Sequence, residues 1–141
     1  MAWLFDTDAL SEVLRRQPLA PYVAWLRTVP RADQFTSAVC IGELFKGAFR
    51  VADSSRHLGN IETRVLRAVT VLPYDVAVAR VYGEIEAGLA RRGALLADAD
   101  LQIAATALYH GLELVTGNLR HFSRVPGLRI HPIMAQSRRG G

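Results

Sequence analysis

The 141-residue chain has one cysteine, one lysine and no long apolar run. A single cysteine, Cys40, excludes an internal disulfide and a zinc site built from cysteines. No apolar stretch reaches the roughly 18 residues of a membrane span, and the N-terminus lacks the basic start and apolar core of a signal peptide. We therefore expect a soluble protein with no membrane partner in a reducing cytoplasm.

Arginine supplies nearly all of the positive charge. Lys46 is the only lysine among 17 basic residues, which outnumber 13 acidic residues and give a formal net charge of +4. The planar guanidinium group suits phosphate, so this composition is compatible with a nucleic-acid partner. A bias toward arginine codons produces the same composition, so the charge alone does not identify a ligand.

Strand-like and helix-like segments alternate along the chain. Apolar and β-branched runs predict strands over 2–5, 35–39, 70–72, 112–115 and 128–130. Between the strands, apolar residues recur at helical spacing over 7–17, 21–29, 41–48, 58–66, 78–89 and 98–110. The alternation favours the α/β class, with a three-layer α/β/α domain and a central, mostly parallel sheet of about five short strands. We expect a single domain over 1–135 and a frayed polar C-terminal tail over 136–141.

Acidic and amide side chains follow several of these strands. Asp6 comes directly after the first strand, and Glu43 is expected in the first turn of the helix after the second. Asp98 and Asp100 open a later helix, in which Asp98 fits the N-cap position and Asp100 the first turn. Asn118 follows the fourth strand. Because the carboxyl ends of parallel strands border the ligand crevice of such a sheet, we expect these side chains to converge.

Converging carboxylates indicate a metal site, because they repel each other unless a cation lies among them. Oxygen ligands without a histidine or thiolate partner favour magnesium or manganese over zinc. Magnesium can activate a water for attack on phosphorus and stabilise the leaving oxygen. The pattern therefore suits phosphodiester hydrolysis.

Other residues near the acids have structural as well as functional interpretations. Thr7 and Asp8 can cap the helix that follows Asp6, which leaves Asp6 in need of another role. Thr7 and Thr116 can also orient carboxylates or water through their hydroxyl groups. Asp98 is either a helix cap or a direct or water-mediated ligand.

Basic and aromatic side chains give weaker signals. Arg120 and His121, just after Asn118, are candidates for contacts with RNA phosphates. The pair Arg138-Arg139 is typical of solvated surface. The apolar stripe of Tyr22, Trp25 and Leu26 is expected in the core, with a dimer or partner surface as the alternative.

Four segments carry a family resemblance: LFDTDALSE (4–12), IGEL (41–44), DLQIAATA (100–107) and LVTGNLRHF (114–122). Together they resemble the PIN-domain ribonucleases, in particular the VapC-type toxins of bacterial toxin–antitoxin pairs. The resemblance spans nearly the whole chain in the expected order and spacing, which makes four weak motifs fairly specific.

The resemblance implies a magnesium- or manganese-dependent endoribonuclease that a cognate VapB-type antitoxin holds inactive, and we expect a homodimer. It implies that Asp6 and Asp100 bind the metal, with Glu43 as the second acid of the set. Asn118 stands where many PIN domains have a fourth acid, so the sequence leaves open whether one metal or two are bound.

Two alternatives remain open from the sequence. The first is a PIN-like module that binds RNA or protein after losing metal competence. The uncharged Asn118 keeps this alternative open, whereas Asp6, Glu43 and Asp100 weigh against it. The run Asp6-Thr7-Asp8 also resembles the paired aspartates of haloacid-dehalogenase-type phosphatases, whose first acid is a covalent nucleophile. The sequence identifies neither the RNA that is cut nor the antitoxin.

Overall fold

A five-stranded parallel sheet forms the centre of the computed structural model, which describes residues 1–140. The strands are β1 (Trp3–Phe5), β2 (Gln34–Ser37), β3 (Thr70–Leu72), β4 (Glu113–Val115) and β5 (Ile130–His131). Their order is β3-β2-β1-β4-β5, and every neighbouring pair is parallel. The prediction of an α/β fold with about five short parallel strands is thus confirmed.

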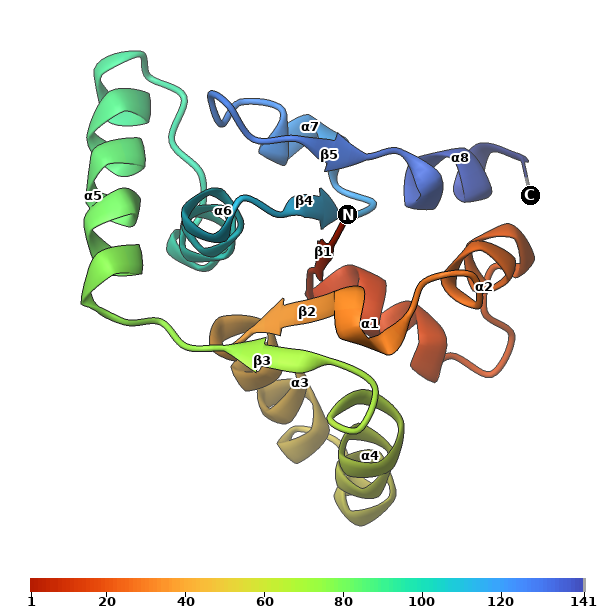
Figure 1. The fold of residues 1–141 in the computed structure, drawn as a ribbon. Helices are drawn as coiled ribbons and strands as arrows, with labels where there is room; N and C mark the ends of the chain where they lie inside the picture. The colour runs from red at the N-terminus through yellow and green to blue at the C-terminus, as the bar shows by residue number, and fades with distance from the viewer. Residues whose placement is uncertain (141) are drawn as a thin grey trace.

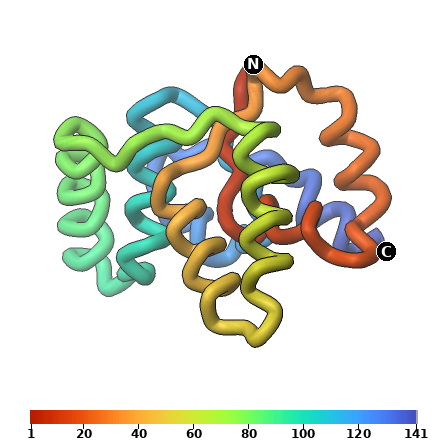
Figure 2. Tube along the Cα trace, turned by 90° about the horizontal axis from the view of Figure 1, so that it is seen from below, coloured from red at the N-terminus to blue at the C-terminus, as the bar shows by residue number. Residues whose placement is uncertain are grey.

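Helices cover both sides of this sheet (Figure 1). The helical segments are α1 (Thr7–Leu14), α2 (Ala20–Leu26), η1 (Arg31–Asp33), α3 (Ala38–Phe49), α4 (Ser54–Asn60), η2 (Ile61–Val65), α5 (Val76–Arg91), α6 (Asp98–His110), α7 (Leu119–Phe122) and α8 (Ile133–Gly140). Helices α5 and α6 lie on one side, and α1, α2 and α8 lie on the other, in both views (Figures 1 and 2). Within residues 1–140 no helix has the length and apolar character needed to cross a bilayer.

The central strand β1 fixes where the carboxyl ends of the strands meet. Leu4 and Phe5 are buried, and Phe5 lies opposite Val115 of β4 in the register of the sheet. The backbone N–H of Asp6 donates to the Val115 carbonyl at 3.1 Å. On the other side of β1, the Thr36 hydroxyl donates to the Phe5 carbonyl at 2.7 Å. The residues that follow β1, β2 and β4 therefore emerge at one edge of the sheet.

The boundary between β2 and α3 differs from the prediction. The hydroxyl of Ser37 accepts from the Cys40 backbone N–H at 3.1 Å, and this N-cap starts α3 at Ala38. The predicted strand extended to residue 39 because Val39 is β-branched, but the cap overrides that propensity. Glu43 consequently lies in the second turn of α3 rather than the first.

Residues 136–140 belong to helix α8, so the prediction of a frayed tail over these residues is wrong. Met134 and Ser137 are buried, and α8 packs against α2. The sequence signal was too short because Ile133, Met134 and Ala135 are the only apolar side chains of this helix, and polar residues follow them. Residue 141, the end of the expected tail, lies outside the described residues.

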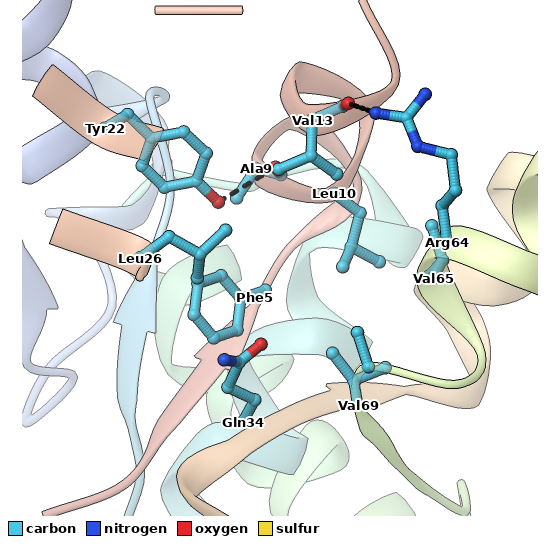
Figure 3. A pocket seen from close by; sticks show the side chains of 11 residues that line it. Phe5, Ala9, Leu10, Val13, Tyr22, Leu26, Gln34, Arg64, Val65 and Val69 are labelled. Atoms are coloured by element: carbon cyan, nitrogen blue, oxygen red, sulfur yellow. Dashed lines mark hydrogen bonds between the residues drawn. The ribbon is translucent and has the colours of Figure 1, made fainter. Parts of the chain in front are cut away.

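An apolar cavity of about 160 Å³ lies between α1, α2 and η2 (Figure 3). Val13, Leu26 and Val69 are among its lining residues, and none of the predicted site residues lines it. The Tyr22 hydroxyl donates to the Ala9 carbonyl at 3.0 Å, and Arg64 donates to the Val13 carbonyl (Figure 3). Tyr22 is fully buried, which agrees with its expected place in the core.

A buried glutamate joins α1 to the start of α2. Glu12 is 2% exposed, and its Oε2 accepts from the Leu19 backbone N–H at 2.9 Å. Its Oε1 lies 3.4 Å from Nη1 of Arg15. Because Leu19 precedes the first residue of α2, the carboxylate satisfies a backbone donor that this helix leaves free.

The Glu12→Ala variant is expected to lower the free energy of unfolding by about 1–3 kcal/mol, because the Leu19 N–H loses its partner. Urea denaturation measures this difference. The matched control is Glu84→Ala, which removes an exposed i,i+4 pair with Arg80 and is expected to cost below about 0.5 kcal/mol. Equal costs for the two variants would contradict a structural role for the Glu12 carboxylate.

Candidate functional site

An open groove of about 520 Å³ lies at the edge where the strands end. The residues that line it are Asp6, Thr7, Asp8, Ser11, Glu43, Asp100, Ile103, Gly117, Asn118, Phe122 and Arg138. The predicted residues Asp6, Thr7, Glu43, Asp100 and Asn118 are thus brought together from α1, α3, α6 and the loop after β4. Their functional roles stay predictions.

Asp6 has a structural role that the sequence analysis assigned to its neighbours. Its Oδ1 accepts from the Ala9 backbone N–H at 2.8 Å, so Asp6 itself is the N-cap of α1. Thr7 and Asp8 lie inside the helix, and the expectation that they would act as caps is wrong. Capping leaves the second carboxylate oxygen of Asp6 for other partners.

Burial makes the charge of Asp6 costly. The side chain is 4% exposed, and this desolvation raises the pKa of the carboxyl to about 7. Hydrogen bonds from Thr116 and the Ala9 backbone lower the pKa, while Asp8 and Asp100 raise it. Thr116 is fully buried, and its hydroxyl also accepts from the Asn118 backbone N–H at 2.9 Å. A cation near Asp6 would favour the charged form.

Glu43 and Thr7 hold each other across the groove. The Thr7 hydroxyl donates to Oε1 of Glu43 at 2.5 Å. Glu43 reaches this position from the second turn of α3, because α1 and α3 pack against each other. The contact orients the carboxylate and leaves Oε2 available to a ligand.

Asp100 forms a small polar group with two residues that follow β4. Its Oδ2 lies 3.6 Å from Nδ1 of His121, and the same Nδ1 lies 2.9 Å from Nδ2 of Asn118. A neutral His121 accepts the Asn118 N–H at Nδ1, whereas a protonated ring faces Asp100 as a cation. Burial raises the pKa of Asp100, His121 opposes the shift and Glu43 adds to it. His121 therefore contacts two groove residues, while Arg120 is exposed outside the lining.

Asp98 lies away from the groove. The N-cap of α6 is Ala97, so Asp98 is the first helical residue and not the cap. Its Oδ1 accepts from the Tyr82 hydroxyl of α5 at 2.8 Å. Residues two apart on a helix point in different directions, which explains why Asp100 lines the groove and Asp98 does not.

Asp8 and Arg138 are groove residues that the sequence analysis missed. Arg138 of α8 lies with Nη2 2.8 Å from Oδ1 of Asp8, and the Gly117 backbone N–H donates to Oδ2 of Asp8 at 3.2 Å. The sequence interpretation placed Arg138 on solvated surface. No local pattern links it to Asp8, because the two residues are 130 positions apart.

The donor chemistry of the groove fits a hydrated magnesium ion. Its carboxylates, hydroxyls and one amide offer oxygen, and no histidine or cysteine lines it. Within residues 1–140, no three acidic, histidine or cysteine side chains are grouped closely enough to hold a metal by themselves. Magnesium is commonly bound through one or two carboxylates with several waters, so the wide spacing of the groove carboxylates is compatible with its usual coordination.

Comparison with known proteins identifies the family. The PIN domain family model matches residues 3–128, and the chain belongs to this family. The tRNA(fMet)-specific endonuclease VapC of Shigella flexneri is 44% identical over 129 residues, covering 92% of this chain and 96% of the relative. Ribonuclease VapC2 of Haemophilus influenzae is 33% identical over 129 residues, with the same coverage of both chains. These similarities place the chain among the VapC-type members of the family.

A solved structure supports this placement. A chain in the DNA-bound VapBC crystal structure from Salmonella typhimurium has a TM-score of 0.83 and 30% sequence identity, covering 93% of this chain and 97% of that one. Nucleases of the VapC type are in general dependent on divalent metal ions. Family membership also removes the haloacid-dehalogenase-type phosphatase, the second alternative from the sequence.

The raised pKa of Asp6 predicts a pH-dependent effect of the Asp6→Asn variant in the absence of metal. Below about pH 4 the carboxyl is protonated in both the folded and the unfolded chain, so its burial costs nothing. As the pH rises to about 7, only the unfolded chain loses the proton, and the wild-type protein loses stability. The stability gained by Asp6→Asn should therefore grow over this range, at most by about 1.4 kcal/mol per pH unit, and then level off.

Urea unfolding in EDTA at several pH values measures this difference between the variant and the wild type. The asparagine retains an oxygen for the Ala9 N–H, so helix capping is preserved. A stability difference that does not change between pH 4 and pH 7 would show that Asp6 ionises normally in the folded protein.

Proposed function

We propose that this protein is a magnesium-dependent endoribonuclease of the VapC type, the toxin of a toxin–antitoxin pair. The observation that carries the proposal is the acidic groove itself, which is lined by the carboxylates of Asp6, Glu43 and Asp100. The relatives named as ribonucleases align over 92% of this chain. The matched family region, residues 3–128, includes Asp6, Glu43 and Asp100.

Asp6 and Asp100 are the residues proposed to hold the metal, with manganese as a substitute for magnesium. When bound, the ion supplies a water of lowered pKa and stabilises charge on the phosphoryl oxygens. Asp6 must lose its proton to serve as a ligand, and its burial delays that loss to near neutral pH. Glu43 accepts from Thr7 through Oε1, which leaves Oε2 to accept a proton from water.

Asn118 contributes orientation rather than charge. It faces His121 through its amide nitrogen, and this contact holds the imidazole beside Asp100. An uncharged residue at this position favours a single tightly held metal. The retained carboxylates of Asp6, Glu43 and Asp100 weigh against a module that only binds RNA or protein.

The names of the relatives suggest the first substrate and partner to test. Two relatives, from Shigella flexneri and Salmonella typhimurium, are tRNA(fMet)-specific endonucleases and are 44% and 41% identical to this chain. We therefore propose tRNA as the first substrate to assay. Solved structures of similar chains are VapBC and FitAB assemblies, which supports a cognate VapB-type antitoxin as partner. We further propose that the protein forms a homodimer and acts in the cytoplasm.

The activity test compares cleavage of labelled tRNA by the wild type, Asp6→Asn and Asp100→Asn, each with magnesium and with EDTA. We expect the wild type to cleave with magnesium and not with EDTA. With magnesium, both variants should cleave slower by roughly a hundredfold or more, because each removes charge from the metal site. Asp98→Asn is the matched control: it changes the same residue type on the same helix outside the groove and should cleave at the wild-type rate.

Full activity of Asp100→Asn, or equal loss in Asp98→Asn, would contradict the assignment of the site. Cleavage that persists in EDTA would contradict the metal dependence.

A further inference from the structure

The acidic groove contains one basic side chain, and it comes from the C-terminal helix. Among the groove-lining residues within 1–140, only Arg138 carries positive charge, whereas Asp6, Asp8, Glu43 and Asp100 are acidic. RNA brings one negative charge per phosphate into this groove. A single metal ion offsets part of the repulsion, and a guanidinium at the groove wall is placed to offset more.

Arg138 is fixed at this position by its neighbours. Its Nη2 lies 2.8 Å from Oδ1 of Asp8, while Oδ2 of Asp8 accepts from the Gly117 N–H. The backbone of Arg138 is also fixed, because the adjacent Ser137 is buried and α8 packs against α2. Asp8 thus connects the start of α1, the loop after β4 and the C-terminal helix.

Gly117 leaves the space that the guanidinium occupies. A Cβ at this position would overlap Nη1 of Arg138 and would lie 2.6 Å from Oδ2 of Asp8. Gly117 has no positive φ that requires glycine, so the absence of a side chain serves the close approach of Arg138.

The guanidinium keeps donors for a ligand. It has five N–H groups, and the contact with Asp8 uses one terminal nitrogen. The side chains of Arg138 and Asp8 are each 40% exposed, so part of the guanidinium is open to solvent in the groove. A planar guanidinium whose Nη2 is held by a carboxylate can still donate to a phosphate through its other N–H groups.

We propose that Arg138 binds a backbone phosphate of the RNA in the groove and that Asp8 and Gly117 position its guanidinium for this contact. The proposal rests on the proposed ribonuclease function. It adds to the acidic residues a substrate-binding residue from a helix that follows the matched family region, residues 3–128. Asp8 is then a positioning residue and not a metal ligand.

The test measures binding of a short fluorescein-labelled single-stranded RNA by anisotropy, with magnesium, in the Asp100→Asn background that suppresses cleavage. Arg138→Ala is expected to weaken binding about tenfold at low salt, as for one lost phosphate contact. The slope of log affinity against log salt concentration should become shallower by about 0.7, the value for one phosphate of a single strand. Arg138→Lys should restore the slope but only part of the affinity, because it keeps the charge without the fork.

Two further variants separate binding from structure. Arg139→Ala removes the same charge from the next residue of α8, which is exposed outside the groove, and should leave both affinity and slope unchanged. Gly117→Ala keeps the net charge but displaces the guanidinium, so it should reproduce the loss seen in Arg138→Ala. In the Arg138→Ala background, Gly117→Ala should have no further effect.

Equal affinity and equal salt slope for Arg138→Ala and Arg139→Ala would overturn the proposal, as would tighter binding by Arg138→Ala. Thermal unfolding of each variant shows whether the substitution disrupts α8. If Arg138→Ala disrupts this helix, the RNA affinity and salt slope of Arg138→Lys are used to test the proposal instead. Cleavage of tRNA by the otherwise unchanged protein is assayed in parallel. If the wild type cleaves tRNA and Arg138→Ala changes neither the RNA affinity nor the salt slope, only the role of Arg138 is wrong. If the wild type cleaves no RNA, the proposed function is wrong.

Discussion

The hydrogen bond from the Ala9 N–H to the Asp6 carboxylate both begins helix α1 and fixes an acidic side chain in the groove. Oδ1 of Asp6 lies 2.8 Å from the Ala9 backbone nitrogen, and the backbone N–H of Asp6 donates to the Val115 carbonyl of the neighbouring strand. The capping carboxylate is 4% exposed, and this burial raises its pKa to about 7. The fold therefore holds an acid where its charge is costly, and a cation in the groove would relieve that cost.

The parallel sheet brings the other groove residues to the same place. Strands β1 and β4 are neighbours, so the residues after them share one edge, and α3 supplies Glu43 after β2. Each carboxylate has a protein partner: Thr7 for Glu43, His121 for Asp100 and Arg138 for Asp8. These partners limit the repulsion among the acids and fix their directions before any ligand binds.

Much of this arrangement could be predicted from the sequence, because it depends on local patterns. Apolar runs marked the strands, and an acid after a buried strand marked Asp6 at the sheet edge. The capping details could not be predicted, since Asp6, Thr7 and Asp8 are all plausible caps and only the backbone geometry selects Asp6. The place of Arg138 in the groove could not be predicted for another reason. Its partner Asp8 is 130 positions away, and no local sequence pattern indicates that contact.

We propose that Asp6 and Asp100 together hold a catalytic divalent ion. The most direct test is a crystal structure with manganese, with the anomalous scattering of the metal measured in the groove. We expect an anomalous peak between the carboxylates of Asp6 and Asp100, and its loss in crystals of Asp100→Asn. A peak at another position, or none at saturating manganese, would contradict the assignment of the metal to these two residues.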